Sequence, residues 1–365
     1  MATTTTTTAA TATASIAAAA TEDRADPANP PQMRAVVQRG YGDSSVLDVA
    51  TIDRPPIAPD QVLIHVRAAG LDRGTEHLLT GRPWLLRLAG FGLLRPKQPV
   101  LGLDVAGVVA AVGSEVTRFA VGDEVFGIAS GSFAEFAAAS ETKLAVKPAG
   151  LTFEQAAVST VSGIAALQAL ADVGRLVAGQ RVLIIGASGG VGTFAVQLAT
   201  ALGGVVDGVA GTANLDLVAS LGAETVYDHR TTDIGTIPGG YDLVLDIGGR
   251  NPVRKLRRLL TDDGTLVIVG GENGNRVTGG IGRQIRAVAL SPFVSQRLTM
   301  FVSTEHHSFI ERLAAHLETG AVEPVIGARF PLDHAVEAVR RMEEGKTSGK
   351  SVIVAGGPFE RRSHG

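Results

Sequence analysis

The pattern of apolar and polar positions divides the chain into two kinds of structure. Between residues 33 and 144, short apolar runs alternate with turns rich in Gly, Pro and Asp, which predicts a β-barrel. The strands expected there are Ala35–Arg39, Val62–Ala68, Ala106–Val112, Glu124–Ile128 and Phe133–Ala139. A short helical insert is expected at Thr75–Thr80.

Beyond residue 180 the pattern changes to strands that alternate with helices, which predicts a parallel, doubly wound sheet. The expected strands are Val182–Ile185, Val205–Ala210, Thr225–Asp228, Tyr241–Ile247, Thr265–Val269 and Leu298–Ser303. The expected helices are Thr193–Leu202, Asn214–Leu221, Val253–Leu260 and Arg283–Leu290. A helical passage at Phe153–Val173 leads into this part. Elements at Phe309–Leu317, Val325–Phe330, Leu332–Glu344 and Ser351–Val354 lead out of it.

The segment Arg181–Thr200 combines a buried strand, a glycine-rich turn and the start of a helix. Such a turn leaves backbone N–H groups free and lets phosphates approach closely, so it predicts a pyrophosphate site. Ala187 stands where the first glycine of a G-x-G-x-x-G motif would be, which makes the match imperfect. The cofactor-binding residues expected in the turn are Gly186, Ala187, Ser188, Gly189, Gly190, Val191 and Gly192.

Ligands of doubly wound sheets bind beyond the carboxyl ends of the strands. This rule adds residues that follow the other strands to the expected cofactor site: Gly211, Thr212, Asn214, Gly248, Gly270 and Gly271. An NAD enzyme normally carries an Asp or Glu at the end of the second strand, for the ribose hydroxyls. Here that strand ends in Val209-Ala210-Gly211-Thr212, without a carboxylate, which favours NADPH over NADH.

Composition excludes several other classes of protein. A net charge of −3 and 4% aromatic residues give no basis for binding nucleic acid or an anionic membrane. The absence of cysteine excludes disulfides and thiolate zinc sites. No apolar run is long enough to span a bilayer, so we expect a cytoplasmic protein. Residues 1–32, a Thr/Ala tract followed by a polar stretch, are expected to be disordered, and residues 358–365 to form a C-terminal tail.

A longer motif points to a known family. The segment Leu101–Gly127, LGLDVAGVVAAVGSEVTRFAVGDEVFG, resembles the medium-chain dehydrogenase/reductase superfamily. Within it, the chain is most similar to the zinc-independent NADPH:quinone oxidoreductase branch, a likeness that extends to GSFAEFAAAS and to the closing TSGKSVIVAGG. Zinc enzymes of the superfamily have a cysteine and a histidine where this chain has Leu71-Asp72 and Leu103, so we expect no metal.

The resemblance implies a fold and further site residues. A GroES-like catalytic domain would comprise residues 33–154 and 306–357, and a Rossmann NADP(H)-binding domain residues 155–305. Asp72 takes the place of the family's active-site asparagine, and His77 is a candidate hydrogen-bond donor to the substrate. Thr160 lies in a segment that passes the nicotinamide in the family, and His229 aligns with a tyrosine that contacts the 2′-phosphate.

The reaction implied is hydride transfer from NADPH to a quinone or an α,β-unsaturated carbonyl compound. An enal or enoyl-thioester reductase is the alternative within the enzymes, and basic residues at the cleft mouth would favour a thioester. A non-catalytic NADPH-binding sensor or structural protein of the same fold is the alternative outside them. The resemblance also implies a homodimer, formed through the edge strand near Leu298–Val302.

Overall fold

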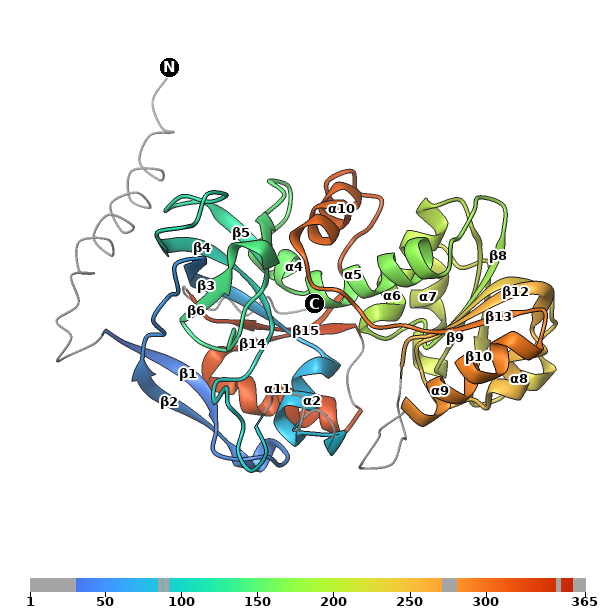
Figure 1. The fold of residues 1–365 in the computed structure, drawn as a ribbon, viewed down its shortest axis with the longest axis horizontal. Coiled ribbons are helices and arrows are strands. Elements are labelled where there is room, and N and C mark those ends of the chain that lie inside the picture. Colours follow the sequence, from blue (N-terminus) through green and yellow to red (C-terminus); the bar gives the residue numbers. More distant parts are fainter. Residues whose placement is uncertain (1–30, 85–86, 88–91, 271–280, 346–348, 357–365) are drawn as a thin grey trace, which may run out of the picture.

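The computed structural model describes residues 31–84, 87, 92–270, 281–345 and 349–356. These residues form two lobes side by side, with helix α5 (Thr160–Leu167) between them (Figure 1). The predictions for residues 1–30 and 358–365 lie outside the described residues. No described helix is both long enough and apolar enough to cross a membrane.

The first lobe is built on a seven-stranded sheet with one parallel pair, β14 and β15. In spatial order its strands are β14 (Ile326–Pro331), β15 (Lys350–Val354), β3 (Gln61–Leu71), β4 (Asp104–Val112), β5 (Glu124–Ile128) and β7 (Leu144–Val146), while β6 (Phe136–Ser140) pairs with β3. A hairpin of β1 (Gln32–Gln38) and β2 (Leu47–Asp53) completes the lobe. Strand β2 was not predicted, because only its first residue, Leu47, is buried and the alternation is weak.

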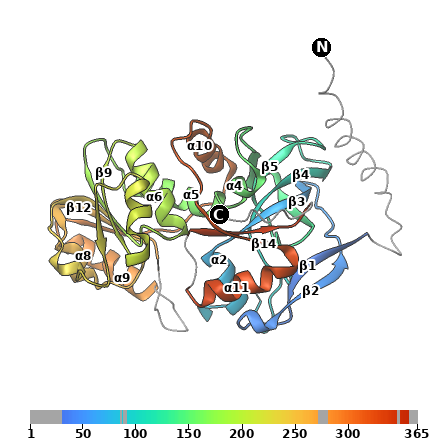
Figure 2. The ribbon, with the colours of Figure 1, turned by 180° about the vertical axis from the view of Figure 1, so that it is seen from behind.

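In the described part of the chain, the helices that accompany this sheet are α2 (Arg73–Thr80), α4 (Phe153–Ala157), α10 (His307–Glu318) and α11 (Ala335–Glu343). Seen from behind, α2 and α11 lie on the same side of the sheet (Figure 2). Helix α2 starts two residues earlier than predicted, because the Asp72 side chain accepts a hydrogen bond from the Thr75 N–H and so caps it.

The second lobe is a six-stranded parallel sheet, which confirms the predicted fold class. Its strands follow the order β10 (Thr225–Asp228), β9 (Val205–Ala210), β8 (Arg181–Ile185), β11 (Tyr241–Asp246), β12 (Leu260–Ile268) and β13 (Arg297–Met300). Its helices are α6 (Gly190–Ala201), α7 (Leu215–Ser220), α8 (Val253–Arg257) and α9 (Ile281–Leu290). The chain reverses its winding direction between β8 and β11, where doubly wound sheets bind their ligands.

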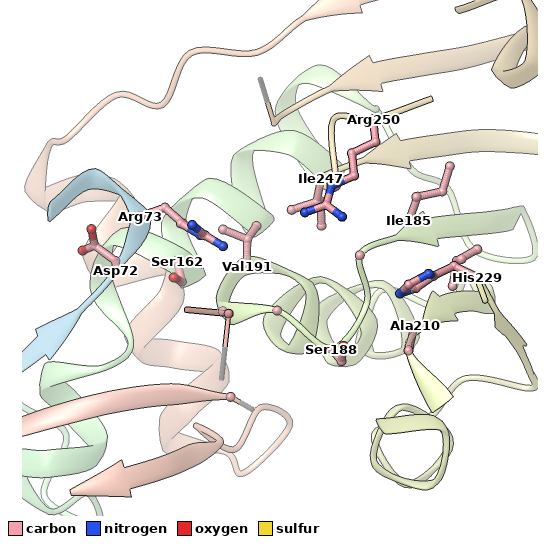
Figure 3. A pocket seen from close by; sticks show the side chains of 18 of the residues that line it. Asp72, Arg73, Ser162, Ile185, Ser188, Val191, Ala210, His229, Ile247 and Arg250 are labelled. Carbon is pink, nitrogen blue, oxygen red and sulfur yellow. The ribbon is translucent and has the colours of Figure 1, made fainter. Parts of the chain in front are cut away.

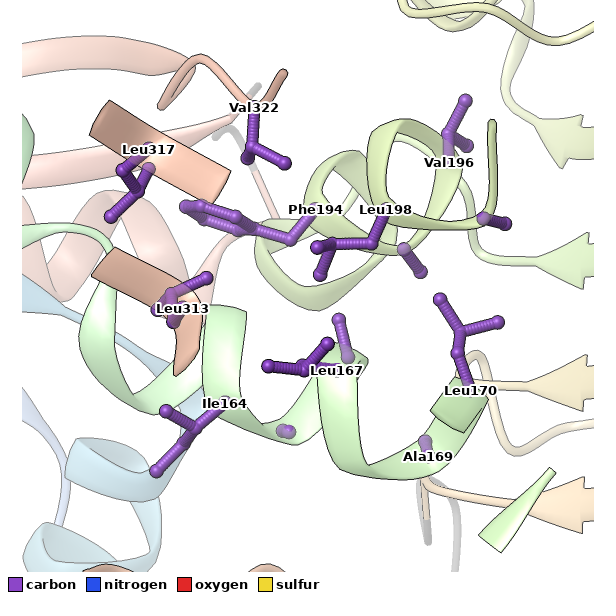
Figure 4. Close-up of a cluster of buried hydrophobic side chains, with 14 of the residues drawn as sticks. Ile164, Leu167, Ala169, Leu170, Phe194, Val196, Leu198, Leu313, Leu317 and Val322 are labelled. Atoms are coloured by element: carbon purple, nitrogen blue, oxygen red, sulfur yellow. The ribbon is translucent and has the colours of Figure 1, made fainter. Parts of the chain in front are cut away.

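One apolar core joins the two lobes. Leu167 on α5, Phe194 and Leu198 on α6, and Leu313 on α10 meet in it (Figure 4). The same cluster includes residues of the first sheet, such as Ala106, and of the second sheet. This packing fixes the two lobes relative to one another through α5, α6 and α10. The exact domain boundaries proposed from the sequence stay predictions.

Candidate functional site

A cavity of about 640 Å³ lies where the two lobes meet. The first lobe lines it with residues 71–74 at the end of β3 and residues 349–351 at the start of β15. The second lobe contributes residues that follow β8, β9, β10 and β11, all at the carboxyl ends of those strands. The guanidinium groups of Arg73 and Arg250 extend into it from opposite walls (Figure 3).

The glycine turn forms the floor of this cavity. Gly186 follows β8 with a φ of +89°, a conformation that favours glycine. Helix α6 begins at Gly190, three residues before the prediction, because the turn itself coils into the first helical turn and glycines carry no apolar signal. Gly190 and Val191 line the cavity. The first N–H groups of a twelve-residue helix, whose positive dipole end attracts anions, therefore face the open space.

The turn leaves no room for a side chain at Gly192. A Cβ on Gly192 would lie 2.1 Å from the Gly186 carbonyl oxygen, whereas a Cβ on Gly189 would have its nearest neighbour at 3.4 Å. Gly192 therefore serves the packing of α6 against the turn, and Gly189 keeps the cavity open. A cradle of this shape fits the pyrophosphate of a dinucleotide.

The structure brings nine of the expected site residues to the cavity lining: Asp72, Gly186, Ser188, Gly189, Gly190, Val191, Gly211, His229 and Gly248. Seven others are not among the lining residues: His77, Thr160, Ala187, Gly192, Thr212, Asn214 and Gly270. Ala187 is buried in the core and Thr160 is buried with a hydroxyl that has no hydrogen-bond partner. Gly271 lies outside the described residues.

The two residues expected to be catalytic occupy different surroundings. Asp72 caps α2 with its Oδ1, which accepts the Thr75 N–H at 2.9 Å, while its Oδ2 is buried without a hydrogen-bond partner. His77 is exposed, and its Nδ1 lies 2.8 Å from the Arg82 carbonyl oxygen. Asp72 thus lies at the cavity wall as a helix cap, and the structure does not bring His77 to it.

A buried ion pair that the sequence did not reveal lies beside Asp72. The Lys350 ammonium, on β15, donates to Asp104 Oδ2 at 2.9 Å and to Ser162 Oγ at 3.1 Å. Burial raises the pKa of Asp104 to about 7, against the opposing effect of Lys350, and the nearby Asp72 charge adds to the rise. Lys350 and Ser162 both line the cavity, so this cluster ties the sheet of the first lobe to α5 at the site.

A carboxylate lies close to the end of the cavity beside β9. Asp228, the last residue of β10, accepts a hydrogen bond of 2.6 Å from the Thr212 hydroxyl and one of 2.9 Å from the Arg230 N–H. In the sequence, the end of β9 is where a carboxylate for the ribose is expected, whereas the parallel pairing of β9 and β10 sets Asp228 opposite Ala210. His229 and Asp233 line this end of the cavity, so an imidazole and a carboxylate both face it.

The described residues that line the cavity form no group able to hold a metal ion. Among the residues that the structure describes, no group of three or more His, Cys, Asp or Glu side chains is placed to hold a metal ion. The carboxylates of Asp104 and Asp72 are close enough for their charges to interact, but Lys350 already pairs with Asp104. The cavity instead has glycine-lined space and helix N–H groups, which suit a phosphate-bearing ligand.

Two family models match the chain. Residues 58–149 match the alcohol dehydrogenase GroES-like domain, and residues 221–353 match a zinc-binding dehydrogenase domain. A human quinone oxidoreductase is 32% identical over 88% of this chain and 98% of its own length. An NADPH-dependent alkenal/one oxidoreductase of Arabidopsis thaliana is 32% identical over 90% of this chain and 81% of its own.

The solved structures agree with these matches. The quinone oxidoreductase of Coxiella burnetii superposes with a TM-score of 0.79 at 26% identity, covering 89% of this chain and all of its own. Sequence and fold thus match over both lobes. The chain belongs to the quinone and enone oxidoreductase branch of the medium-chain dehydrogenase/reductase superfamily.

Proposed function

We propose that this oxidoreductase uses NADPH, without zinc, to reduce a quinone or an α,β-unsaturated carbonyl compound. The observation that carries the proposal is the glycine-lined cavity between the lobes, with the α6 N-terminus on its floor. The named relatives support it, since they include quinone and NADPH-dependent alkenal/one oxidoreductases.

Different residues of the cavity would hold different parts of such a cofactor. The turn from Gly186 to Gly192 would bind the pyrophosphate through backbone N–H groups. Gly211 and His229 would face the adenosine ribose, and Gly248 the opposite side of the crevice. The negative charges of Asp228 and Asp233 would disfavour a 2′-phosphate near that ribose. The positive charge of Arg230, and that of His229 when it is protonated, would favour one. Choice between NADPH and NADH therefore depends on this small cluster.

The chemistry itself belongs to the cofactor, which when bound supplies a hydride to an electron-poor carbon of the acceptor. The chain's part is to exclude water from the space between the lobes and to meet the charge that develops on the acceptor oxygen. The contacts of Asp72 and His77 with the substrate stay predictions. A conjugated acceptor spreads the developing charge over its own atoms, which suits a site without a metal.

The proposal is tested by following the oxidation of NADPH and NADH in parallel with a panel of acceptors. A naphthoquinone, an enal, an enone and an enoyl thioester form the panel, each with and without a chelator. We expect turnover with NADPH and a quinone or enone, unchanged by the chelator. Loss of turnover on chelation would contradict the zinc-free mechanism. Tight NADPH binding without turnover of any acceptor would favour the sensor or structural protein.

A thioester substrate is the second candidate, and Arg73 and Arg250 are the observation that favours it. Both line the cavity and extend from opposite lobes, where they would suit the phosphates of a coenzyme A thioester. The same two charges also suit the cofactor's own phosphates. Faster turnover of a coenzyme A thioester than of a short thioester with the same enoyl group would decide for this substrate.

We also propose a cytoplasmic homodimer that pairs through the free edge of the second sheet. Strand β13 ends that sheet, and near it lie exposed apolar side chains: Ile285, Val288, Phe293 and Val302. Phe293 is 82% exposed and Val302 74%, which favours a covering partner. Light scattering would test this, since a monomer mass at micromolar concentration contradicts the dimer, and cell fractionation would test the location.

A further inference from the structure

One arginine links three segments at the edge of the cavity. Arg283 lies in the first turn of α9, and its guanidinium pairs with the carboxylate of Asp246, the last residue of β11. The same group donates to the Asn251 carbonyl oxygen at 2.9 Å and to the Gly270 carbonyl oxygen at 3.1 Å. A single planar side chain therefore fixes α9, the loop after β11 and the end of β12 to one another.

The loop that Arg283 holds is a wall of the proposed cofactor site. Ile247, Gly248, Arg250 and Asn251 all line the cavity, and Figure 3 labels Ile247 and Arg250 among them. Asp246 is fully buried below this loop and also accepts the Gly249 N–H at 3.3 Å. The Asp246 carboxylate thus faces the loop on one side and the guanidinium on the other.

The neighbouring segment leaves the loop little freedom of its own. A Cβ on Gly270 would lie 1.8 Å from the Ile247 carbonyl oxygen, so the two chain segments touch backbone to backbone. The Val269 and Gly270 N–H groups both donate to the Asp246 carbonyl oxygen, at 3.0 and 3.2 Å. A shift of Gly270 or of Asn251, whose carbonyl groups Arg283 binds, would therefore move the cavity wall.

We propose that Arg283 is a positioning residue for the cofactor, which holds the loop from Ile247 to Asn251 in the shape that the nucleotide needs. This inference rests on the proposed function, because it concerns the same cofactor site. Arg283 itself is not among the residues that line the cavity, so it acts through the loop.

The chain offers a matched control in the same sheet. Arg181 pairs at 3.0 Å with Asp207, a buried aspartate on the adjoining strand β9, and Asp207 also accepts the Tyr241 hydroxyl at 2.7 Å. Each of the two buried aspartates would keep one hydrogen bond if its arginine were replaced. The Arg181 pair lies away from the cavity lining, so its loss would affect stability alone.

The test compares Arg283→Met, Arg283→Lys and Arg181→Met with the wild type, by NADPH titration well below every unfolding temperature. We expect Arg283→Met to weaken NADPH binding and raise its KM by roughly 10- to 100-fold, because a small misplacement of a positioning group costs this much. The KM of the quinone should change little. Arg283→Lys keeps the charge beside Asp246 but lacks the planar fork, so it should recover stability and leave NADPH binding weak.

The outcomes separate the two proposals. Wild-type NADPH affinity in Arg283→Met, or an equal loss of affinity in Arg181→Met, would overturn the positioning role and leave the proposed function standing. Full recovery of NADPH affinity in Arg283→Lys would also overturn it, since charge alone would then suffice. A wild type that binds neither nucleotide would overturn the proposed function, and this inference with it. If Arg283→Met does not fold, Arg283→Lys carries the comparison.

Discussion

Replacing Lys350 with methionine is expected to destabilise the protein by about 3–5 kcal/mol above neutral pH, because it leaves a buried carboxylate without its counter-charge. The Lys350 side chain is 3% exposed and Asp104 is fully buried, so water cannot replace the lost ammonium. From the residues that the structure describes, Asp104 would keep the hydrogen bond from the Val161 N–H, at 2.7 Å. Urea denaturation of Lys350→Met and wild type measures the loss directly.

The loss should grow with pH. The folded-state pKa of Asp104 is about 7, above its ordinary value of 3.8, so this carboxyl favours the folded state fully below pH 3.8 and loses that contribution as pH rises through 7. Without Lys350 the folded-state pKa rises further, and ionising Asp104 becomes still more costly. The difference between variant and wild type should therefore be small at pH 5 and large at pH 8.

A second buried lysine provides the control. Lys147 is 4% exposed like Lys350, but its partner Glu124 is 51% exposed and can turn to solvent. Lys147→Met also removes hydrogen bonds to the Pro148 and Leu151 carbonyl oxygens, which costs about 1–3 kcal/mol. This smaller loss should not depend on pH between 5 and 8. A Lys350→Met variant with the same pH-independent loss would contradict the buried ion pair.

The sequence was sufficient to predict the fold because its strongest signals are local. Strands β9 and β10 begin and end where predicted, because glycines or polar residues bound each of them in the sequence. Helix α6 was predicted three residues too late, because Gly190 and Gly192 carry no side chain that could show helical spacing. Strand β2 was missed because its alternation is weak at a half-exposed edge.

The site was predictable where it lies on the glycine turn, at the carboxyl ends of the parallel strands, or at a position that the family resemblance marks. The glycine turn lies within one strand–turn–helix unit, so its place at the cavity could be inferred. The pairing of Lys350 with Asp104 joins residues 246 positions apart, and although both lie in segments that carry the family resemblance, nothing local predicts that they meet. Asp228 was overlooked because it reaches Thr212 from a neighbouring strand, and His77 turned to the Arg82 carbonyl group because its helix ends there.

Replacing Gly192 with alanine is expected to damage both the fold and the cofactor site. The added methyl would lie 2.1 Å from the Gly186 carbonyl oxygen and 2.7 Å from the Ala187 carbonyl group, and all these neighbours are backbone atoms. Relief of this clash must push α6 away from the turn, at a cost of about 3 kcal/mol or more. Thermal denaturation should show the loss, and NADPH titration should show affinity reduced with it.

Gly189→Ala makes the same chemical change three residues earlier and should act differently. Gly189 has a φ of −78°, which alanine adopts freely, and its added methyl would meet no atom closer than 3.4 Å. Stability should therefore stay within about 1 kcal/mol of wild type, since such a change mostly alters the entropy of the unfolded chain. The methyl would nevertheless occupy the floor of the cavity, where phosphates must approach the backbone N–H groups. NADPH binding should weaken while the melting temperature holds. If Gly189→Ala binds NADPH as well as wild type, the pyrophosphate does not lie on this turn.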